Sequence, residues 1–159
     1  MKTTDLCDAH GSDVRVSEPL WQDFGGIAEF GGAAVCLRVL DDNSSVRAAL
    51  EGAGEGRVLV VDGGGSRRCA LLGGNLAALG ADNGWAGIVV HGCVRDREEI
   101  GACRIGVKAL ATHPRRSEKR GAGEEEVVLG FAGITVAPGE YVYADEDGLI
   151  VAAAALTLD

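Results

Sequence analysis

The chain has 159 residues, a length that fits one domain with its own core, and 24 acidic against 15 basic residues give it a formal net charge of −9. Hydrophobic residues make up 47% and charged residues 25% of the sequence, a balance that is typical of a globular protein and excludes a disordered one. The acidic excess disfavours direct binding to nucleic acid, which needs Lys and Arg to displace counterions from phosphates, but it does not exclude a basic protein partner.

The N-terminal segment has no apolar run of signal-peptide length, and no stretch approaches the ~20 apolar residues of a membrane span. The five cysteines are widely spaced and form no CxxC pair, so a zinc site is not expected. An odd number of cysteines without a secretory signal fits reduced thiols. We therefore expect a cytoplasmic protein that has no membrane partner.

Short helices and strands alternate in the first part of the chain. Residues Thr4–His10 predict a helix, and the aromatic side chains of segment 19–24 predict a stretch that packs onto the rest of the domain. Phe30–Leu40 predicts a strand, and Val46–Leu50 predicts a short helix that follows a capping turn and ends at glycines. Arg57–Asp62 is a mostly apolar run between turn signals, which is typical of a strand buried on both faces.

The middle of the chain continues this alternation. The apolar spacing of Asn75–Ala81 predicts a helix, and Ala86–Gly92 predicts a second buried strand. Arg97–Ile100 predicts a short helix and Val107–Ala111 a third core strand. Strands that are joined through helices need crossover connections, so these elements predict a layered domain.

The last third is richer in strands and tight turns. A polar, basic loop is expected at His113–Gly123, and turns are expected at 138–139 and at Asp145–Gly148, whose acidic side chains would be solvated. The strands are expected at Glu124–Leu129, Ile134–Val136 and Leu149–Ala154. With no repeat and no interdomain linker, residues 1–159 predict a single α/β or β/β/α domain.

Two of the buried strands end in unusual turns about thirty residues apart. One ends at Asp62–Ser66 and the other at Gly92–Asp96, and the segment Leu72–Leu76 between them starts a helix. Ligands of parallel α/β sheets bind where the carboxyl ends of strands meet the following loops. A helix N-terminus adds unpaired amides and a partial positive charge, so it attracts anions.

The residue types at these turns suit a small keto acid. Arg95 offers a planar, bidentate binder for a carboxylate, and Asp96 offers a hard oxygen ligand for Mg²⁺ or Mn²⁺, which would polarise a carbonyl. The same residues also fit a structural salt bridge, and the glycines Gly63–Gly65 fit a tight turn. The glycine spacing matches no nucleotide-binding motif.

Several motifs match one known family, and together they cover nearly the whole chain. In order they are Arg57–Ser66 (RVLVVDGGGS), Gly84–Asp96 (GWAGIVVHGCVRD), Ile105–Ala109 (IGVKA), Gly121–Glu124 (GAGE), Gly133–Gly139 (GITVAPG) and Tyr143–Val151 (YADEDGLIV). By these motifs the chain resembles the family that contains regulator of ribonuclease E activity A (RraA) and the class II 4-hydroxy-4-methyl-2-oxoglutarate aldolases.

The resemblance implies a three-layer β/β/α domain, similar to swivelling domains, that forms a ring-shaped homotrimer with sites between subunits. It implies that Asp96 binds Mg²⁺ or Mn²⁺, and that Arg95 and the amides of Gly73, Gly74, Asn75 and Leu76 hold the substrate carboxylate. Glu124 is the candidate for a carboxylate that reaches the site across a subunit boundary. The implied reactions are cleavage of 4-hydroxy-4-methyl-2-oxoglutarate and, as a side activity, decarboxylation of oxaloacetate, both through a pyruvate enolate.

One departure bears on activity. Active members usually carry an acidic residue about twenty residues before the Arg-Asp pair, and this chain has Gly74 there. Regulator-type members need no metal. The alternative is therefore a non-catalytic protein that binds and inhibits ribonuclease E or an RNA helicase. An older label for the family, a menaquinone methyltransferase, finds no support because no glycine-rich methyl-donor loop is visible.

His91 lies at a strand end, close in sequence to the Arg-Asp pair. A place near the metal is conceivable for it, but packing in a core or an interface is the favoured interpretation.

Overall fold

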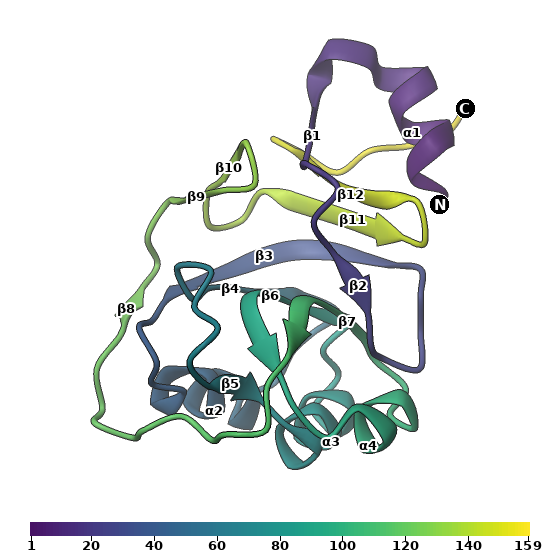
Figure 1. Ribbon diagram of the computed structural model, residues 1–159. Coiled ribbons are helices and arrows are strands. Elements are labelled where there is room, and N and C mark those ends of the chain that lie inside the picture. The colour runs from purple at the N-terminus through teal and green to yellow at the C-terminus, as the bar shows by residue number, and fades with distance from the viewer.

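The computed structural model describes residues 1–159 and shows two β layers and one helical layer (Figure 1). The helices span Thr3–His10 (α1), Ser44–Glu51 (α2), Gly74–Asp82 (α3) and Arg97–Gly101 (α4), with a 3₁₀ turn at Gly11–Asp13 (η1). The strands span Val14–Val16 (β1), Gln22–Asp23 (β2), Phe30–Arg38 (β3), Val58–Asp62 (β4), Ala70–Leu72 (β5), Gly87–Val94 (β6), Gly106–Thr112 (β7), Glu124–Glu125 (β8), Leu129–Phe131 (β9), Ile134–Val136 (β10), Tyr141–Asp145 (β11) and Gly148–Ala152 (β12).

The main sheet is mixed and runs in the order β1-β12-β11-β3-β4-β6-β7-β2. Its long strand β3 belongs to both β layers, because Phe30–Ala33 pair antiparallel with β11 while Ala34–Arg38 pair in parallel with β4. β4, β6 and β7 continue the parallel part. Figure 1 shows β11, β12 and β1 on one side of this parallel part and α2, α3 and α4 on the other.

Alternation along the central strands builds a core on each face of the parallel sheet. In β4, Val58 and Val60 point into the core between the two β layers, whereas Leu59 and Val61 join the core against the helices. Both faces are therefore covered, which explains why this strand is continuously apolar. The helical layer contributes Val46 and Leu50 of α2 together with residues of α3 and α4.

Most of the expected elements are confirmed, with ends that differ by a few residues. One expectation for the last third is wrong, and one strand was not expected. A single strand was expected at Glu124–Leu129, but Glu126 adopts a left-handed backbone (φ 53°) and separates β8 from β9. The strand expected at Leu149–Ala154 ends at Ala152. No strand was expected at Tyr141–Asp145, yet it forms β11, which pairs on both sides with β12 and β3.

The acidic turn after β11 also differs from expectation, because Asp145 is buried rather than solvated. Its carboxylate accepts hydrogen bonds from the Thr3 amide and the Thr3 hydroxyl, both at 2.7 Å. Asp145 therefore fixes the start of α1 to the β11–β12 hairpin. Burial alone would raise the pKa of this carboxyl, but the hydrogen bonds from Thr3 and from the amides of Asp147 and Gly148 lower it below its ordinary value.

The five cysteines are all free thiols, as expected, and three of them are buried. None of the helices is both long enough and apolar enough to cross a membrane.

Candidate functional site

A cleft of about 710 Å³ opens where α3 begins and β6 ends. It is lined by Asn43, Arg47, Ala70, Gly73, Asn75, Leu76, Arg95, Asp96, Arg115, Arg116, Ser117, Glu118 and Lys119. The topology brings these segments together, because β5 and β7 both pair with β6 and the amide of Arg95 bonds to the carbonyl of Leu72 at 2.9 Å. The cleft thus lies at the carboxyl edge of the parallel strands, where the sequence placed it.

Asp96 is held in a left-handed backbone conformation (φ 62°, ψ 50°) at the turn from β6 into α4. Such a conformation costs an L-residue roughly 1–2 kcal/mol, so its surroundings must fix it. The amide of Gly74 donates a hydrogen bond of 3.0 Å to Oδ2 of Asp96. A Cβ on Gly73 would lie 2.8 Å from the same oxygen, so glycine is needed there for space.

Arg95 and Asp96 form no ion pair with each other, so the structural salt bridge that the sequence also allowed is wrong. The only side-chain hydrogen bond of Arg95 is a long one, 3.4 Å, from Nη1 to the carbonyl of Pro114. Most of the donor capacity of its guanidinium is therefore open to the cleft.

Gly74 is the one residue of the expected amide segment that does not line the cleft. It is buried, and its amide is occupied by Asp96. A Cβ on Gly74 would lie 2.2 Å from Oε2 of Glu99 and 2.7 Å from the Cβ of Glu99. The carboxylate of Glu99, on α4, thus occupies the space into which a side chain at position 74 would project.

Four basic side chains of the cleft were not predicted to be functional: Arg47 on α2, and Arg115, Arg116 and Lys119 on the loop after β7. None of them, nor Arg95, has a carboxylate partner within ion-pair distance. One third of the basic residues of an acidic chain therefore stand unpaired around a single cleft. The signal that was present in the sequence is the run of basic residues inside the predicted loop 113–123.

This segment, called the basic loop below (residues 113–123), passes close to β5 and α2 in Figure 1 before it reaches β8. The buried carboxylate of Asp42 holds it in place by accepting hydrogen bonds from the amides of Arg120 (2.8 Å) and Ala122 (3.2 Å). Burial alone would raise the pKa of Asp42, but these bonds and those from Ser44 outweigh it and lower the pKa to about 2. The Ser117 hydroxyl accepts a further bond from the Asn43 amide at 3.2 Å.

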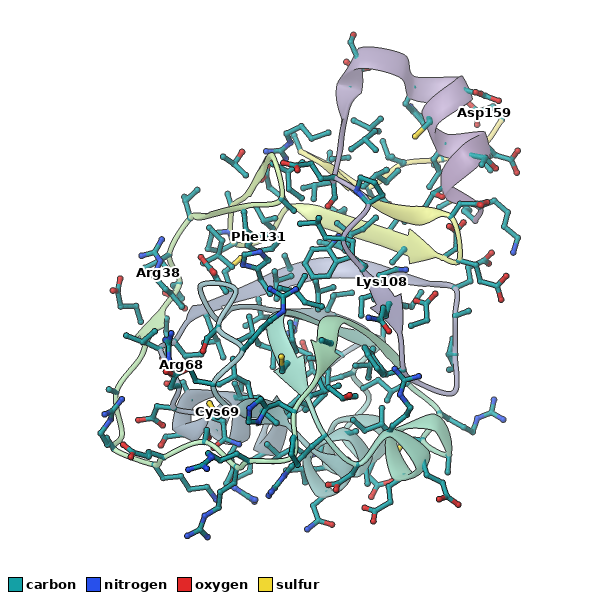
Figure 2. All side chains as sticks on the ribbon, in the orientation of Figure 1. Arg38, Arg68, Cys69, Lys108, Phe131 and Asp159 are labelled. Atoms are coloured by element: carbon teal, nitrogen blue, oxygen red, sulfur yellow. The ribbon has the colours of Figure 1, made fainter.

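Two other residues singled out in the sequence lie outside the cleft. Glu124 is on β8, where its carboxylate pairs with Arg38 at 3.0 Å; Figure 2 shows Arg38 at the outer side of the molecule. His91 stacks on Phe131 with ring centroids 4.9 Å apart, and its Nδ1 lies 3.5 Å from Oδ1 of Asp62. The packing interpretation of His91 is thus the correct one.

A divalent cation fits the cleft only as a sparsely ligated ion. The chain contains no group of three or more His, Cys, Asp or Glu side chains placed to share a metal. Asp96 is the carboxylate that lines the cleft beside Arg95, and only its Oδ2 accepts a hydrogen bond. Mg²⁺ is commonly bound by one or two carboxylates while keeping several waters, and Mn²⁺ also prefers oxygen ligands, so the donors suit these ions rather than zinc.

Together, these observations define a mixed α/β protein whose candidate site is a cation-lined cleft at a helix N-terminus. Comparison with known proteins places it more narrowly: residues 3–151 match the RraA-like family model described as Aldolase/RraA, and the chain belongs to this family.

Two relatives, both provisionally named 4-hydroxy-4-methyl-2-oxoglutarate aldolase, come from Burkholderia multivorans and Alkalilimnicola ehrlichii. They are 59% and 58% identical to the chain, over 98% and 94% of its length and 98% and 93% of their own.

Two solved structures share both the fold and about half of the sequence. One is named S-adenosylmethionine: 2-dimethylmenaquinone methyltransferase, from Geobacillus kaustophilus, with a TM-score of 0.96 and 50% identity over 98% of this chain and 97% of that one. The other is named the RNA-processing inhibitor RraA, from Thermus thermophilis, with a TM-score of 0.95 and 48% identity over 99% of this chain and 95% of that one.

Proposed function

We propose that this protein is a divalent-metal-dependent lyase that acts on small 2-keto acids, as a 4-hydroxy-4-methyl-2-oxoglutarate aldolase with oxaloacetate decarboxylase side activity. The observation that carries the proposal is the unpaired Arg95 beside the rigidly held Asp96 in a cation-lined cleft. The names of the relatives from Burkholderia multivorans and Alkalilimnicola ehrlichii support the aldolase assignment.

Each cleft residue has a definite part in this proposal. Arg95 holds the carboxylate next to the keto group in a bidentate contact, and the first-turn amides of α3 at Asn75 and Leu76 add a partial positive charge. Asp96 is the residue that would hold Mg²⁺ or Mn²⁺. A bound divalent cation supplies Lewis-acid polarisation of the keto oxygen. The Gly74 amide keeps the Asp96 carboxylate oriented, so Gly74 acts through Asp96 rather than on the substrate.

The homotrimer implied by the resemblance is part of the proposal. Glu124 lies on an exposed strand away from the cleft of its own chain, so it can contribute a carboxylate only to a neighbouring subunit. The mass of the protein in solution, measured by light scattering, tests the assembly. A monomeric mass would mean that Glu124 has no part in the site.

The test of the lyase is oxaloacetate decarboxylation, followed by coupling pyruvate to lactate dehydrogenase, with Mg²⁺ or Mn²⁺ and then with a chelator. We expect turnover above the metal-only background, its loss with chelator, and a loss of at least about 100-fold in Asp96→Ala. Asp82→Ala, which removes an exposed carboxylate at the other end of α3, is the matched control and should keep wild-type activity. Full activity in Asp96→Ala would overturn the proposal.

A second candidate is a regulator that binds ribonuclease E or an RNA helicase without catalysis. It is favoured by the similarity to the RNA-processing inhibitor from Thermus thermophilis and by the net charge of −9, which suits a basic, arginine-rich partner segment. This candidate predicts salt-sensitive binding to such a partner that survives in Asp96→Ala. Absence of binding at low ionic strength would count against it.

A methyltransferase has less support despite the name of the Geobacillus kaustophilus structure. The methyl donor carries a positively charged sulfonium, and the cleft is lined by five unpaired basic side chains that would repel it.

A further inference from the structure

Asn43 lines the cleft from the start of α2, and its side chain does not cap that helix. It occupies the N-cap position, where the side chain of an asparagine normally accepts a hydrogen bond from the first turn. Asp42 caps the start of α2 instead, because its Oδ1 accepts hydrogen bonds from the amide (2.9 Å) and the hydroxyl (2.6 Å) of Ser44. The side-chain amide of Asn43 is therefore not used for the structural role that its position implies.

The side-chain oxygen of Asn43 is unusual within the whole chain. Only two buried side-chain nitrogen or oxygen atoms have no hydrogen-bond partner, and the other one belongs to His91, outside the cleft. A buried acceptor without a partner costs about 1–3 kcal/mol, and such exceptions are few in folded proteins. Because this acceptor belongs to a residue of the cleft wall, the missing donor is expected on a bound ligand.

The backbone of Asn43 is held on both sides, so its side chain extends from a fixed point. Its N–H donates a hydrogen bond of 3.2 Å to the hydroxyl of the buried Ser117, and its carbonyl accepts one of 3.1 Å from the amide of Arg47. No hydrogen bond of the side-chain oxygen fixes the plane of the amide. A rotation about the last side-chain bond can therefore turn this oxygen into the cleft when a ligand is bound.

The cleft offers many hydrogen-bond donors and few free acceptors. Its donors include five basic side chains and the first-turn amides of α3. Of its two carboxylates, Asp96 is the one that would hold the metal, and Glu118 is engaged by Arg120 at 3.2 Å. A keto diacid is ionised at neutral pH, and its carboxylate and keto oxygens can only accept hydrogen bonds. The hydroxyl on C4 of 4-hydroxy-4-methyl-2-oxoglutarate is therefore the one donor of that substrate, whereas oxaloacetate has no such hydroxyl.

We infer that Asn43 selects 4-hydroxy-2-keto acids by accepting a hydrogen bond from their C4 hydroxyl. The inference rests on the proposed function, in which Arg95 holds the carboxylate beside the keto group. A site built to bind a hydroxyl discriminates against a substrate that lacks it, because the polar group of the site is then left without a partner. An amide oxygen does not take up the proton that leaves as the bond between C3 and C4 breaks, so Asn43 determines specificity and is not the base.

The test compares cleavage of 4-hydroxy-4-methyl-2-oxoglutarate with decarboxylation of oxaloacetate, both followed as pyruvate, in wild type, Asn43→Ala and Asn43→Asp. We expect Asn43→Ala to lower kcat/KM for the hydroxy acid about tenfold relative to that for oxaloacetate, mainly through a higher KM. Asn43→Asp keeps an acceptor at the same place and should keep the wild-type ratio. The melting temperature of Asn43→Ala should equal that of wild type because no capping bond is lost, whereas a merely structural role would lower it.

The outcomes separate this role of Asn43 from the proposed function. An unchanged ratio in Asn43→Ala, whether both activities fall together or neither does, overturns the role and leaves the lyase standing. An equal loss of the ratio in Asn43→Asp also overturns it, because the acceptor would then not be what matters. If wild type decarboxylates oxaloacetate but does not cleave the hydroxy acid, the role of Asn43 falls and the decarboxylase remains. If wild type acts on neither substrate, the proposed function falls and the role of Asn43 falls with it.

Discussion

Among single residues, Gly73 and Gly74 are selected by the space around them and not by their backbone angles. Neither has a positive φ, so another residue could adopt the same conformation. The side chain of Asp96 lies against Gly73 and that of Glu99 lies against Gly74, and each is too close to leave room for a Cβ on the glycine. Glu99 on α4 thus occupies the space that an acidic side chain at position 74 would need, a steric coupling of the two positions that the sequence pattern alone does not reveal.

This coupling predicts that Gly74→Asp, introduced alone, destabilises the protein. Its Cβ would overlap Glu99, and overpacking of this kind costs about 1–3 kcal/mol. Combined with Glu99→Gly, the same substitution should recover part of the loss, because glycine removes both the carboxylate and the Cβ that occupy this space. Urea unfolding midpoints measure both, with Asn75→Asp as the control at an exposed neighbouring position. A single variant as stable as wild type would show that Glu99 moves aside at no cost.

The sequence located Arg95, Asp96 and the amide segment because they sit in contiguous motifs at strand ends, and the structure places Gly73, Asn75 and Leu76 beside them. Arg47 and the arginines of the basic loop could not be placed in the same way. They come from segments about seventy residues apart in the chain, and only the tertiary fold brings these into one cleft.

Among elements, the edge strand β2 depends on a buried ion pair. Lys108 on β7 is only 2% exposed, and its ammonium lies 2.8 Å from Oδ1 of Asp23 on β2. Figure 2 shows Lys108 close to β2, beneath the β11–β12 layer. Removing the carboxylate would leave a buried charge without a partner, whereas removing the lysine leaves a half-exposed carboxylate that water can solvate.

We therefore predict an asymmetric result for the two partners. Asp23→Ala should lower the free energy of unfolding by about 3 kcal/mol, and Lys108→Met by about 1 kcal/mol or less. Urea denaturation of the two variants and of their combination tests this. If Asp23→Ala proves as mild as Lys108→Met, the ammonium reaches water or another partner.

The basic loop is the second element whose order depends on one residue. The Asp42 carboxylate accepts hydrogen bonds from two amides of this loop. Asp42→Asn removes the negative charge and one acceptor, so it should loosen the loop and lower the free energy of unfolding by about 1–3 kcal/mol. Because the loop contains four Lys and Arg residues, limited trypsin digestion reports the loosening directly. We expect faster cleavage between residues 115 and 120 in Asp42→Asn and no change in Asp8→Asn. Equal cleavage rates in wild type and Asp42→Asn would show that other contacts hold the loop.

Strands with a strong apolar pattern in their own sequence were predictable. Strands that form only because they pair with neighbouring strands were not. β4 and β6 are continuous apolar runs because both of their faces are covered. β2 has only two residues, both exposed, and gains its conformation from pairing with β7. β11 pairs on both sides, yet it lies between two predicted turns that hide its pattern.

At the scale of the whole molecule, net charge and local charge have opposite effects on stability in acid. The net charge of −9 falls towards zero as the pH approaches the isoelectric point near 4.8, which relieves repulsion at the surface. This relief is small because exposed charges are screened beyond a Debye length of about 8–10 Å. The carboxyls of Asp42, Asp62 and Asp145 are instead buried, and hydrogen bonds hold the pKa of each below its ordinary value of 3.8.

We predict that these buried carboxylates decide the pH dependence, so that stability declines below about pH 4.5 rather than peaking at the isoelectric point. A carboxyl whose pKa is lower in the folded state binds its proton more readily when unfolded. Its contribution is therefore complete above the unfolded pKa and is lost as the pH falls through the folded pKa, which for Asp42 is about 2. For Asp42 this corresponds to about 2 kcal/mol. Urea unfolding at pH 7, 5, 4 and 3 measures the trend, and Asp42→Asn should flatten it. A stability maximum at pH 4.8 that added salt abolishes would show that surface repulsion dominates instead.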